Sequence, residues 1–178
     1  DEKPAELAAH AFHHGQFRAY HTDDLTGVCI GGSLKNVMAI ACGVSDGVGL
    51  GSNARAALIT RGLAEITRLA VRLGANPLTM MGLAGMGDLV LTCTGNLSRN
   101  RRVGLALGEG RTLSDILEEL GEVAEGVRTA KSAWELSERE GVEMPITQQI
   151  YEMLYADKPV RVALRDLMSR DRRSERDK

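Results

Sequence analysis

The sequence predicts a mostly α-helical protein with one short strand near its amino end, and three observations support this prediction. From about residue 27 onward, apolar residues recur at the three- and four-residue spacing of an amphipathic helix. Ser, Thr or Asn precede many of these runs and Gly follows them, as expected at helix ends. Aromatic residues make up only 3% of the chain against 43% apolar residues, so small and aliphatic side chains must fill the core.

The amino-terminal part predicts a helix followed by a strand. Residues 4–14 form a short amphipathic pattern that stops at Gly15, and residues 17–20 predict the strand. A lone strand cannot satisfy its backbone hydrogen bonds, so we expect this piece to belong to a sheet outside the chain. The chain starts without Met and is expected to be a fragment. The expected division is the end of a preceding domain at 1–26, a helical domain at 27–168 and a charged tail at 169–178.

The helical part is predicted to be built around one central helix. Residues 28–48 are apolar and rich in Gly, Ala and Ser, which allows close approach to neighbouring helices. Ser52 is expected to cap a second helix, and Asn76-Pro77 a third, which Gly85-Met86-Gly87 breaks. The further helices are expected at 53–73, 98–107, 112–120 (capped by Thr112), 128–140, 146–156 and after Pro159.

Composition excludes several classes of function. A net charge of −2 gives no general attraction to nucleic acid or to an anionic membrane. We expect no membrane span, because no apolar run approaches the roughly 20 residues that one requires. The charged start is unlike a signal peptide. Cys29, Cys42 and Cys93 lack metal-type spacing, so they are expected to be buried reduced thiols of a cytoplasmic protein without a metal site.

Lys35 is the first candidate for chemistry. It is the only lysine between Lys3 and Lys131, and it lies in the most apolar stretch of the chain. Burying a lysine costs several kcal/mol unless it is paired, and such a lysine suits general acid–base work. The competing interpretation is a lysine that reaches solvent from a helix edge. Asp88, which follows Gly87, is either a helix cap or the counter-ion of Lys35.

A second candidate is the polar segment 94–102, which leads into a helix start carrying Arg99, Arg101 and Arg102. A helix amino terminus offers free N–H groups, and arginine offers forked donors that match phosphate. The segment therefore indicates a site for a small phosphorylated ligand. A solvated basic face explains the segment equally well when it is taken alone. Residues 122–127 are by themselves an ordinary acidic loop.

Taken together, these segments resemble the bacterial-type NAD(P)-dependent glycerol-3-phosphate dehydrogenases. The resemblance spans residues 17–156 and rests on motifs in the family's order, at 32–43, 46–53, 87–94, 98–102 and 123–126. It implies the all-helical C-terminal domain of the 6-phosphogluconate-dehydrogenase-like type, preceded in the family by a Rossmann domain. It also implies interconversion of dihydroxyacetone phosphate and sn-glycerol 3-phosphate with NAD or NADP, feeding phospholipid synthesis, by a homodimer.

The resemblance implies a role for each matching residue. Lys35 would exchange a proton with the substrate C2 oxygen, Asp88 would hold Lys35 and contact substrate, and Thr92 would join this proton network. The residues implied to bind glycerol 3-phosphate are Lys35, Asp88, Ser98, Arg99 and Asn100. Those implied to contact the cofactor are Arg99, Val123 and Glu125.

Two departures from the family pattern and one absence qualify this resemblance. The family usually has an acidic residue near Cys29 and Ala at Ser33, both close to Lys35. No G-x-G-x-x-G fingerprint lies between a strand and a helix, so the chain is expected to be inactive alone.

Three alternatives are weighed against the resemblance. A β-hydroxyacid-type dehydrogenase would have Asn four residues after the lysine, where this chain has Ala39. A helical interaction module would make Lys35 and Asp88 only a structural ion pair. A nucleic-acid binder is disfavoured by the net charge and the few aromatics.

Overall fold

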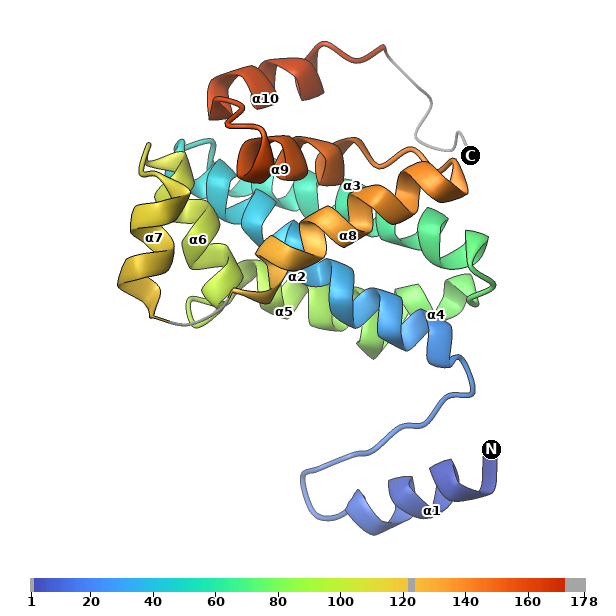
Figure 1. Ribbon diagram of the computed structural model, residues 1–178. Coiled ribbons are helices and arrows are strands. Elements are labelled where there is room, and N and C mark those ends of the chain that lie inside the picture. Colours follow the sequence, from blue (N-terminus) through green and yellow to red (C-terminus); the bar gives the residue numbers. More distant parts are fainter. Residues whose placement is uncertain (1, 122–123, 172–178) are drawn as a thin grey trace.

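Helix α2, Leu25–Gly47, is the centre of the fold (Figure 1). The computed structural model describes residues 2–121 and 124–171. Asp24 caps α2, because its Oδ1 accepts a hydrogen bond from the N–H of Gly27 at 2.8 Å. Its Oδ2 accepts from the N–H of Asn76 at 2.9 Å, which ties the start of α2 to the start of α4. Other helices cover α2 on several sides, and this explains why the helix is apolar around most of its circumference.

Helices α3, α4, α5, α6, α8 and α9 and the turn η1 pack against α2, whereas α7 packs against α6 and α10 lies on the outside against α9 (Figure 1). Their bounds are α3 Gly51–Arg72, α4 Pro77–Met81, η1 Leu83–Gly87, α5 Asp88–Thr94, α6 Arg99–Gly108, α7 Leu113–Leu120, α8 Glu125–Glu140, α9 Pro145–Tyr155 and α10 Val160–Met168. The predicted mostly helical class is confirmed.

Helices α2 and α6 touch through their backbones. A Cβ atom added at Gly43 would lie 2.1 Å from the carbonyl oxygen of Arg101, and one added at Gly104 would lie 2.0 Å from that of Ile40. Real Cβ atoms do not approach backbone so closely, so only glycine permits this spacing. The glycine-rich composition of the central stretch thus sets how near the amino end of α6 lies to α2.

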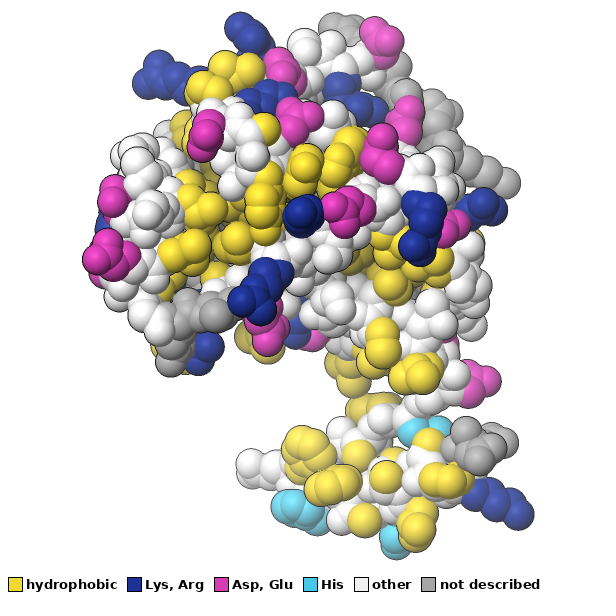
Figure 2. Space-filling view, viewed as in Figure 1, with side chains coloured by type: hydrophobic (Ala, Val, Ile, Leu, Met, Phe, Trp, Pro, Cys, Tyr) yellow, Lys and Arg dark blue, Asp and Glu magenta, His cyan; other side chains and the backbone are white. Residues whose placement is uncertain are grey.

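Helix α1, Glu2–Phe12, extends away from the bundle on an extended connection (Figure 1). The strand predicted at 17–20 is wrong: across the described residues no strand forms, and Phe17 makes only an isolated antiparallel bridge with His14. A strand needs a partner, and this chain supplies none at that place. Figure 2 shows apolar side chains gathered over this arm, where Leu7, Phe12, Phe17 and Tyr20 are exposed.

Two of the predicted helix caps are confirmed. The side chain of Asn76 accepts from the N–H of Leu78 at 2.9 Å, and that of Thr112 accepts from the N–H of Asp115 at 3.2 Å. The predicted cap at Ser52 is wrong, because α3 already begins at Gly51 after the positive-φ residue Gly49. A side-chain cap is the usual way for a helix to begin, but here the positive φ angles open to glycine set the start of α3.

The predicted break at residues 85–87 is also wrong. These residues complete the π-helical turn η1, which runs directly into α5. A Cβ at Gly85 would lie 2.2 Å from the carbonyl oxygen of Met80, so glycine is needed there for close approach to α4. Helix α8 likewise begins at Glu125, three residues before the predicted start.

The apolar length of α2 was underestimated from the sequence. With 23 residues, α2 is long and apolar enough to cross a membrane by composition, yet 67% of its most apolar window is buried inside the bundle. Its place in the core accounts for its apolarity. Cys42 and Cys93 are buried free thiols as predicted, whereas Cys29 is exposed. Cys29 departs from the prediction because the first turns of α2 lie at the edge of the bundle, where Leu25 is also exposed.

Candidate active site

Lys35 and Asp88 form an ion pair where α2 crosses α5. The Nζ of Lys35 donates a hydrogen bond to Oδ2 of Asp88, and the two side chains are 23% and 33% exposed. Asp88 is the first residue of α5, but its side chain makes no capping bond to that helix. The structure therefore brings together the two residues that the sequence proposed as partners, and the interpretation of Asp88 as a helix cap is not realised.

Thr92 lies one turn after Asp88 and fixes it. Its Oγ1 donates to the backbone oxygen of Asp88 at 2.6 Å and lies 3.3 Å from Oδ1 of the same residue. One carboxylate oxygen thus faces Thr92 and the other faces Lys35. Because an ammonium group has three N–H donors, Lys35 has donors left for a bound oxygen.

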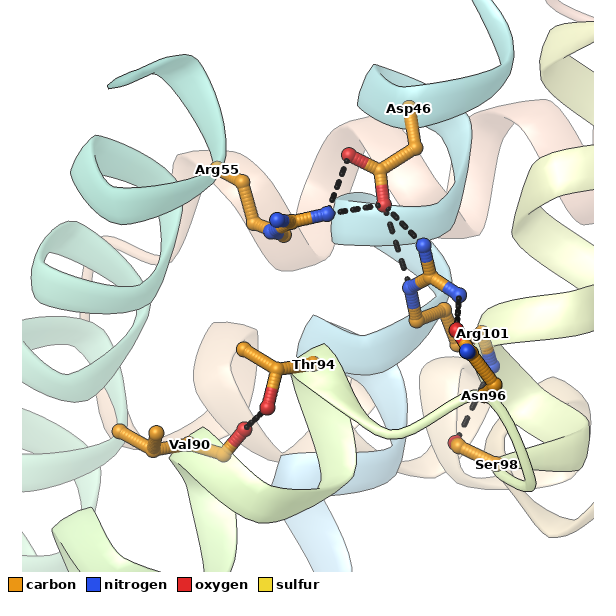
Figure 3. A network of polar contacts seen from close by, with 7 residues as sticks. All are labelled: Asp46, Arg55, Val90, Thr94, Asn96, Ser98 and Arg101. Carbon is orange, nitrogen blue, oxygen red and sulfur yellow. Dashed lines mark hydrogen bonds and ion pairs between the residues drawn. The ribbon is translucent and has the colours of Figure 1, made fainter. Parts of the chain in front are cut away.

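The amino end of α6 forms the second part of the site. Ser98 is the cap of α6, and its Oγ accepts from the N–H of Arg101 at 3.3 Å. Asn100 is buried, and its Oδ1 accepts from the N–H of Gly126 at 2.9 Å, which ties α6 to the start of α8. Arg99 is exposed, whereas Arg101 turns inward to Asp46 (Figure 3). The three arginines are therefore not one basic face.

Both parts line one pocket of about 620 Å³. Of the residues predicted from the sequence, it is lined by Lys35, Thr92, Ser98, Arg99, Asn100 and Glu125. Asp88 is not a lining residue and reaches the pocket only through its ion pair with Lys35. Its other lining residues are Asn36, Leu91, Gly95, Asn96, Leu97 and Ala124. Val123, which the resemblance implied as a cofactor contact, lies outside the described residues.

A second pocket of about 500 Å³ adjoins the first and shares Asn36 and Glu125 with it. Ser33 and Arg128 also line it. Neither Asn36 nor Arg128 was predicted from the sequence to be a site residue. A signal existed for Asn36, since it is a buried polar residue directly after Lys35 in an otherwise apolar helix. Arg128 carried no such signal.

The arrangement suits a small anion. Lys35 and Arg99 supply positive charge to the pocket, and the free N–H groups at the start of α6 add a positive dipole end. A ligand held by its anionic end at α6 would place its other end near the Lys35–Asp88 pair, where a proton can be exchanged.

Comparison with known proteins decides the family. The model of the NAD-dependent glycerol-3-phosphate dehydrogenase C-terminus matches residues 24–165. This chain belongs to that family. It is 59% identical over 174 residues to glycerol-3-phosphate dehydrogenase [NAD(P)+] of Geobacter sp. (strain M21), a match that covers 98% of this chain and 52% of that protein. It is 64% identical over 159 residues to the Myxococcus xanthus protein of the same name, covering 89% and 48%.

Solved structures of the family have the same fold. The glycerol-3-phosphate dehydrogenase of Coxiella burnetii superposes with a TM-score of 0.91 at 45% identity, covering 96% of this chain and 52% of that one. The yeast enzyme superposes with a TM-score of 0.83 at 31% identity, covering 96% and 49%. The chain thus spans about half the length of the relatives it matches. The family match also excludes the β-hydroxyacid-type alternative that Ala39 already disfavoured.

Proposed function

We propose that this chain is the catalytic half of an enzyme that interconverts dihydroxyacetone phosphate and sn-glycerol 3-phosphate with NAD or NADP. One observation carries the proposal: Lys35, which is ion-paired with Asp88, lines the same pocket as the amino end of α6. A phosphorylated three-carbon substrate needs both features, an anion site and a proton donor at a fixed distance from it.

The phosphate of the substrate would be bound by Ser98, Arg99 and Asn100. Arg99 offers a forked pair of donors, and the start of α6 adds backbone N–H groups. This orientation directs the C2 carbonyl toward Lys35. The ammonium polarises the carbonyl oxygen and donates a proton to it as negative charge develops there. In the opposite direction, Lys35 accepts the proton of the C2 hydroxyl.

Asp88 and Thr92 act on Lys35 rather than on the carbonyl alone. Asp88 holds the ammonium at the pocket wall, and Thr92 restricts rotation of the Asp88 carboxylate. We also propose that Asp88 contacts a substrate hydroxyl group, as the family resemblance implies. Such preorganisation lowers the cost of aligning the donor in the transition state.

The nicotinamide cofactor would supply or accept the hydride at C2 when it is bound. The residues present fit a partial cofactor contact: Glu125 lies between the two pockets, and Arg99 reaches the first of them. We propose that Glu125, Arg99 and Val123 contact the cofactor. Tight binding requires the dinucleotide-binding half, so we expect this chain to be inactive alone.

We propose that the residues before the Asp24 cap belong to that other half, rather than all of 1–26, because Leu25 and Thr26 are already part of α2. The rest of the chain up to residue 168 would form the catalytic domain, and 169–178 would be the charged tail. The exposed apolar residues of the amino-terminal arm support this division, because a face of this kind is buried in a complete domain. The free thiols agree with a cytoplasmic enzyme. From the family resemblance we also propose that the complete enzyme is a homodimer and that its product feeds phospholipid synthesis.

The test is reconstitution. This chain is mixed with a separately expressed dinucleotide-binding half of a relative, and NAD(P)H oxidation is followed with dihydroxyacetone phosphate. We expect oxidation that Lys35→Met abolishes and that Lys131→Met, a change at an exposed lysine on α8, leaves intact. Absence of oxidation with both halves folded and associated would contradict the proposal and favour a helical interaction module.

A further inference from the structure

Asp46 occupies a place where a carboxylate is normally unfavourable. It is the penultimate residue of α2, at the negative end of the helix dipole, and its side chain is only 12% exposed. No part of Asp46 lines either pocket. Because a largely buried carboxylate at the carboxyl end of a helix is unfavourable, we expect Asp46 to make stabilising or functional contacts with other elements.

Two arginines from different helices converge on this carboxylate (Figure 3). The Nη1 atom of Arg55 lies 3.0 Å from Oδ1 and 2.9 Å from Oδ2. Arg101 donates to Oδ2 through Nε at 3.1 Å and through Nη2 at 2.6 Å. The two N–H groups of Arg101 on one oxygen fix the plane of its guanidinium.

The third nitrogen of that guanidinium reaches the pocket wall. The Nη1 atom of Arg101 donates to Oδ1 of Asn96 at 3.2 Å, and its backbone N–H donates to Oγ of Ser98. The loop 95–98 lies between α5 and α6, and all of its residues line the larger pocket. Apolar packing does not anchor this loop, since Leu97 at its centre is 95% exposed. Backbone hydrogen bonds hold its two ends, from the N–H of Gly95 to Leu91 and from the N–H of Ser98 to Gly95, and the bond from Arg101 holds the side chain of Asn96 between them.

We propose that Asp46 is a positioning residue for the anion-binding end of the pocket, acting through Arg101 on the loop 95–98. Arg101 is a link in this chain of contacts and not a phosphate ligand. The inference rests on the proposed function, because it takes the loop 95–98 and Ser98 as the phosphate end of the site.

The kinetic test uses Asp46→Asn in the reconstituted enzyme. Asparagine keeps the size of the side chain but removes the charge that orders Arg101. We expect the KM for dihydroxyacetone phosphate to rise about tenfold, with kcat within about twofold and the KM for NAD(P)H unchanged, because loss of ground-state binding raises KM alone. The matched control is Arg55→Met, which removes the other ion pair of Asp46 and leaves the Asp46–Arg101 contact; we expect a change in KM below about twofold.

An equal rise in KM for the two variants would show that Asp46 is merely structural and would overturn the inference. A second readout does not depend on turnover. In NMR spectra of this chain, Asp46→Asn should shift and broaden the side-chain amide signals of Asn96, whereas Arg55→Met should leave them in place. Unchanged Asn96 signals in Asp46→Asn would overturn the inference even if the wild-type enzyme proved inactive. Absence of wild-type turnover with shifted Asn96 signals would contradict the proposed function and leave the link standing.

Discussion

Replacing Glu65 by Gln should remove most of the pH dependence of stability in this chain between about pH 5 and about pH 8. Glu65 lies on α3, is 2% exposed and caps a different helix, α9. Its carboxylate accepts from the N–H of Ile146 at 2.7 Å and from that of Thr147 at 3.2 Å. These are free N–H groups of the first turn of α9, whose own cap position, Met144, supplies no side-chain bond.

The magnitude follows from the pKa of Glu65 in the folded state. Burial raises this pKa from 4.5 to about 7, although the N–H donors of Ile146 and Thr147 and the charge of Arg68 act in the opposite direction. Between these two values the folded state binds more protons than the unfolded state, so the free energy of unfolding falls as pH rises. Because the values differ by about 2.5 and each pH unit corresponds to about 1.4 kcal/mol, the loss amounts to about 3 kcal/mol.

The assay is urea unfolding of the wild-type chain and Glu65→Gln between about pH 5 and about pH 8. We expect the wild type to lose about 3 kcal/mol relative to the variant across this range, most of it complete above about pH 7. Glu135→Gln, a change at an exposed carboxylate on α8, is the control and should leave the wild-type profile nearly unchanged. Parallel profiles for the wild type and Glu65→Gln would refute the argument that burial dominates at this site.

Three further outcomes are expected. Asp88→Asn should lower kcat of the reconstituted enzyme by about tenfold or more while the melting temperature hardly changes, because the pair with Lys35 is partly exposed; an unchanged kcat would remove the orienting role. Arg99→Ala should raise the KM for the phosphorylated substrate about tenfold or more, and an equal rise for a non-phosphorylated analogue would contradict phosphate recognition. Gly43→Ala should cost about 2–3 kcal/mol of unfolding free energy, since its Cβ would meet the backbone of α6. A Cβ at Gly32 in the same helix would meet open space, so Gly32→Ala should not lower the unfolding free energy measured by calorimetry. Similar losses for both variants would contradict the close-packing argument.

Local features of the fold were predictable from the sequence, and features that depend on distant partners were not. The caps at Asn76 and Thr112 involve neighbouring residues, so composition reveals them. The prediction of a strand at 17–20 was wrong because a strand needs a second strand to pair with, which the local sequence pattern cannot reveal. The cap that Glu65 supplies to α9 joins residues about eighty positions apart, and no local pattern indicates it.

The same distinction applies to the site. The isolation of Lys35 in an apolar stretch indicated that it needed a counter-ion, and Asp88 was a correct choice. The sequence could not show which arginine of the segment faces the pocket. Arg99 and Arg101 are about 200° apart around a helix, so they point to opposite sides. Which side faces the pocket depends on where α6 packs. A carboxylate at the end of a helix, Asp46, was the one sequence feature that could have identified Arg101 as an inward-facing residue.

Helix α2 connects these observations, because it fixes the spacing between the two ends of the site. Lys35 and Asp46 are eleven residues apart, which is about three helical turns and about 16 Å, so both lie on nearly the same face. Gly43 lies between them in the chain, about 80° around the helix from Lys35, and lets α6 contact the backbone of α2 there. The distance from Lys35 to the Ser98 end of the pocket is therefore set by one rigid helix and one close glycine contact. A larger residue at position 43 should for this reason disturb substrate binding as well as stability, whereas Gly32→Ala should leave the stability of the fold intact.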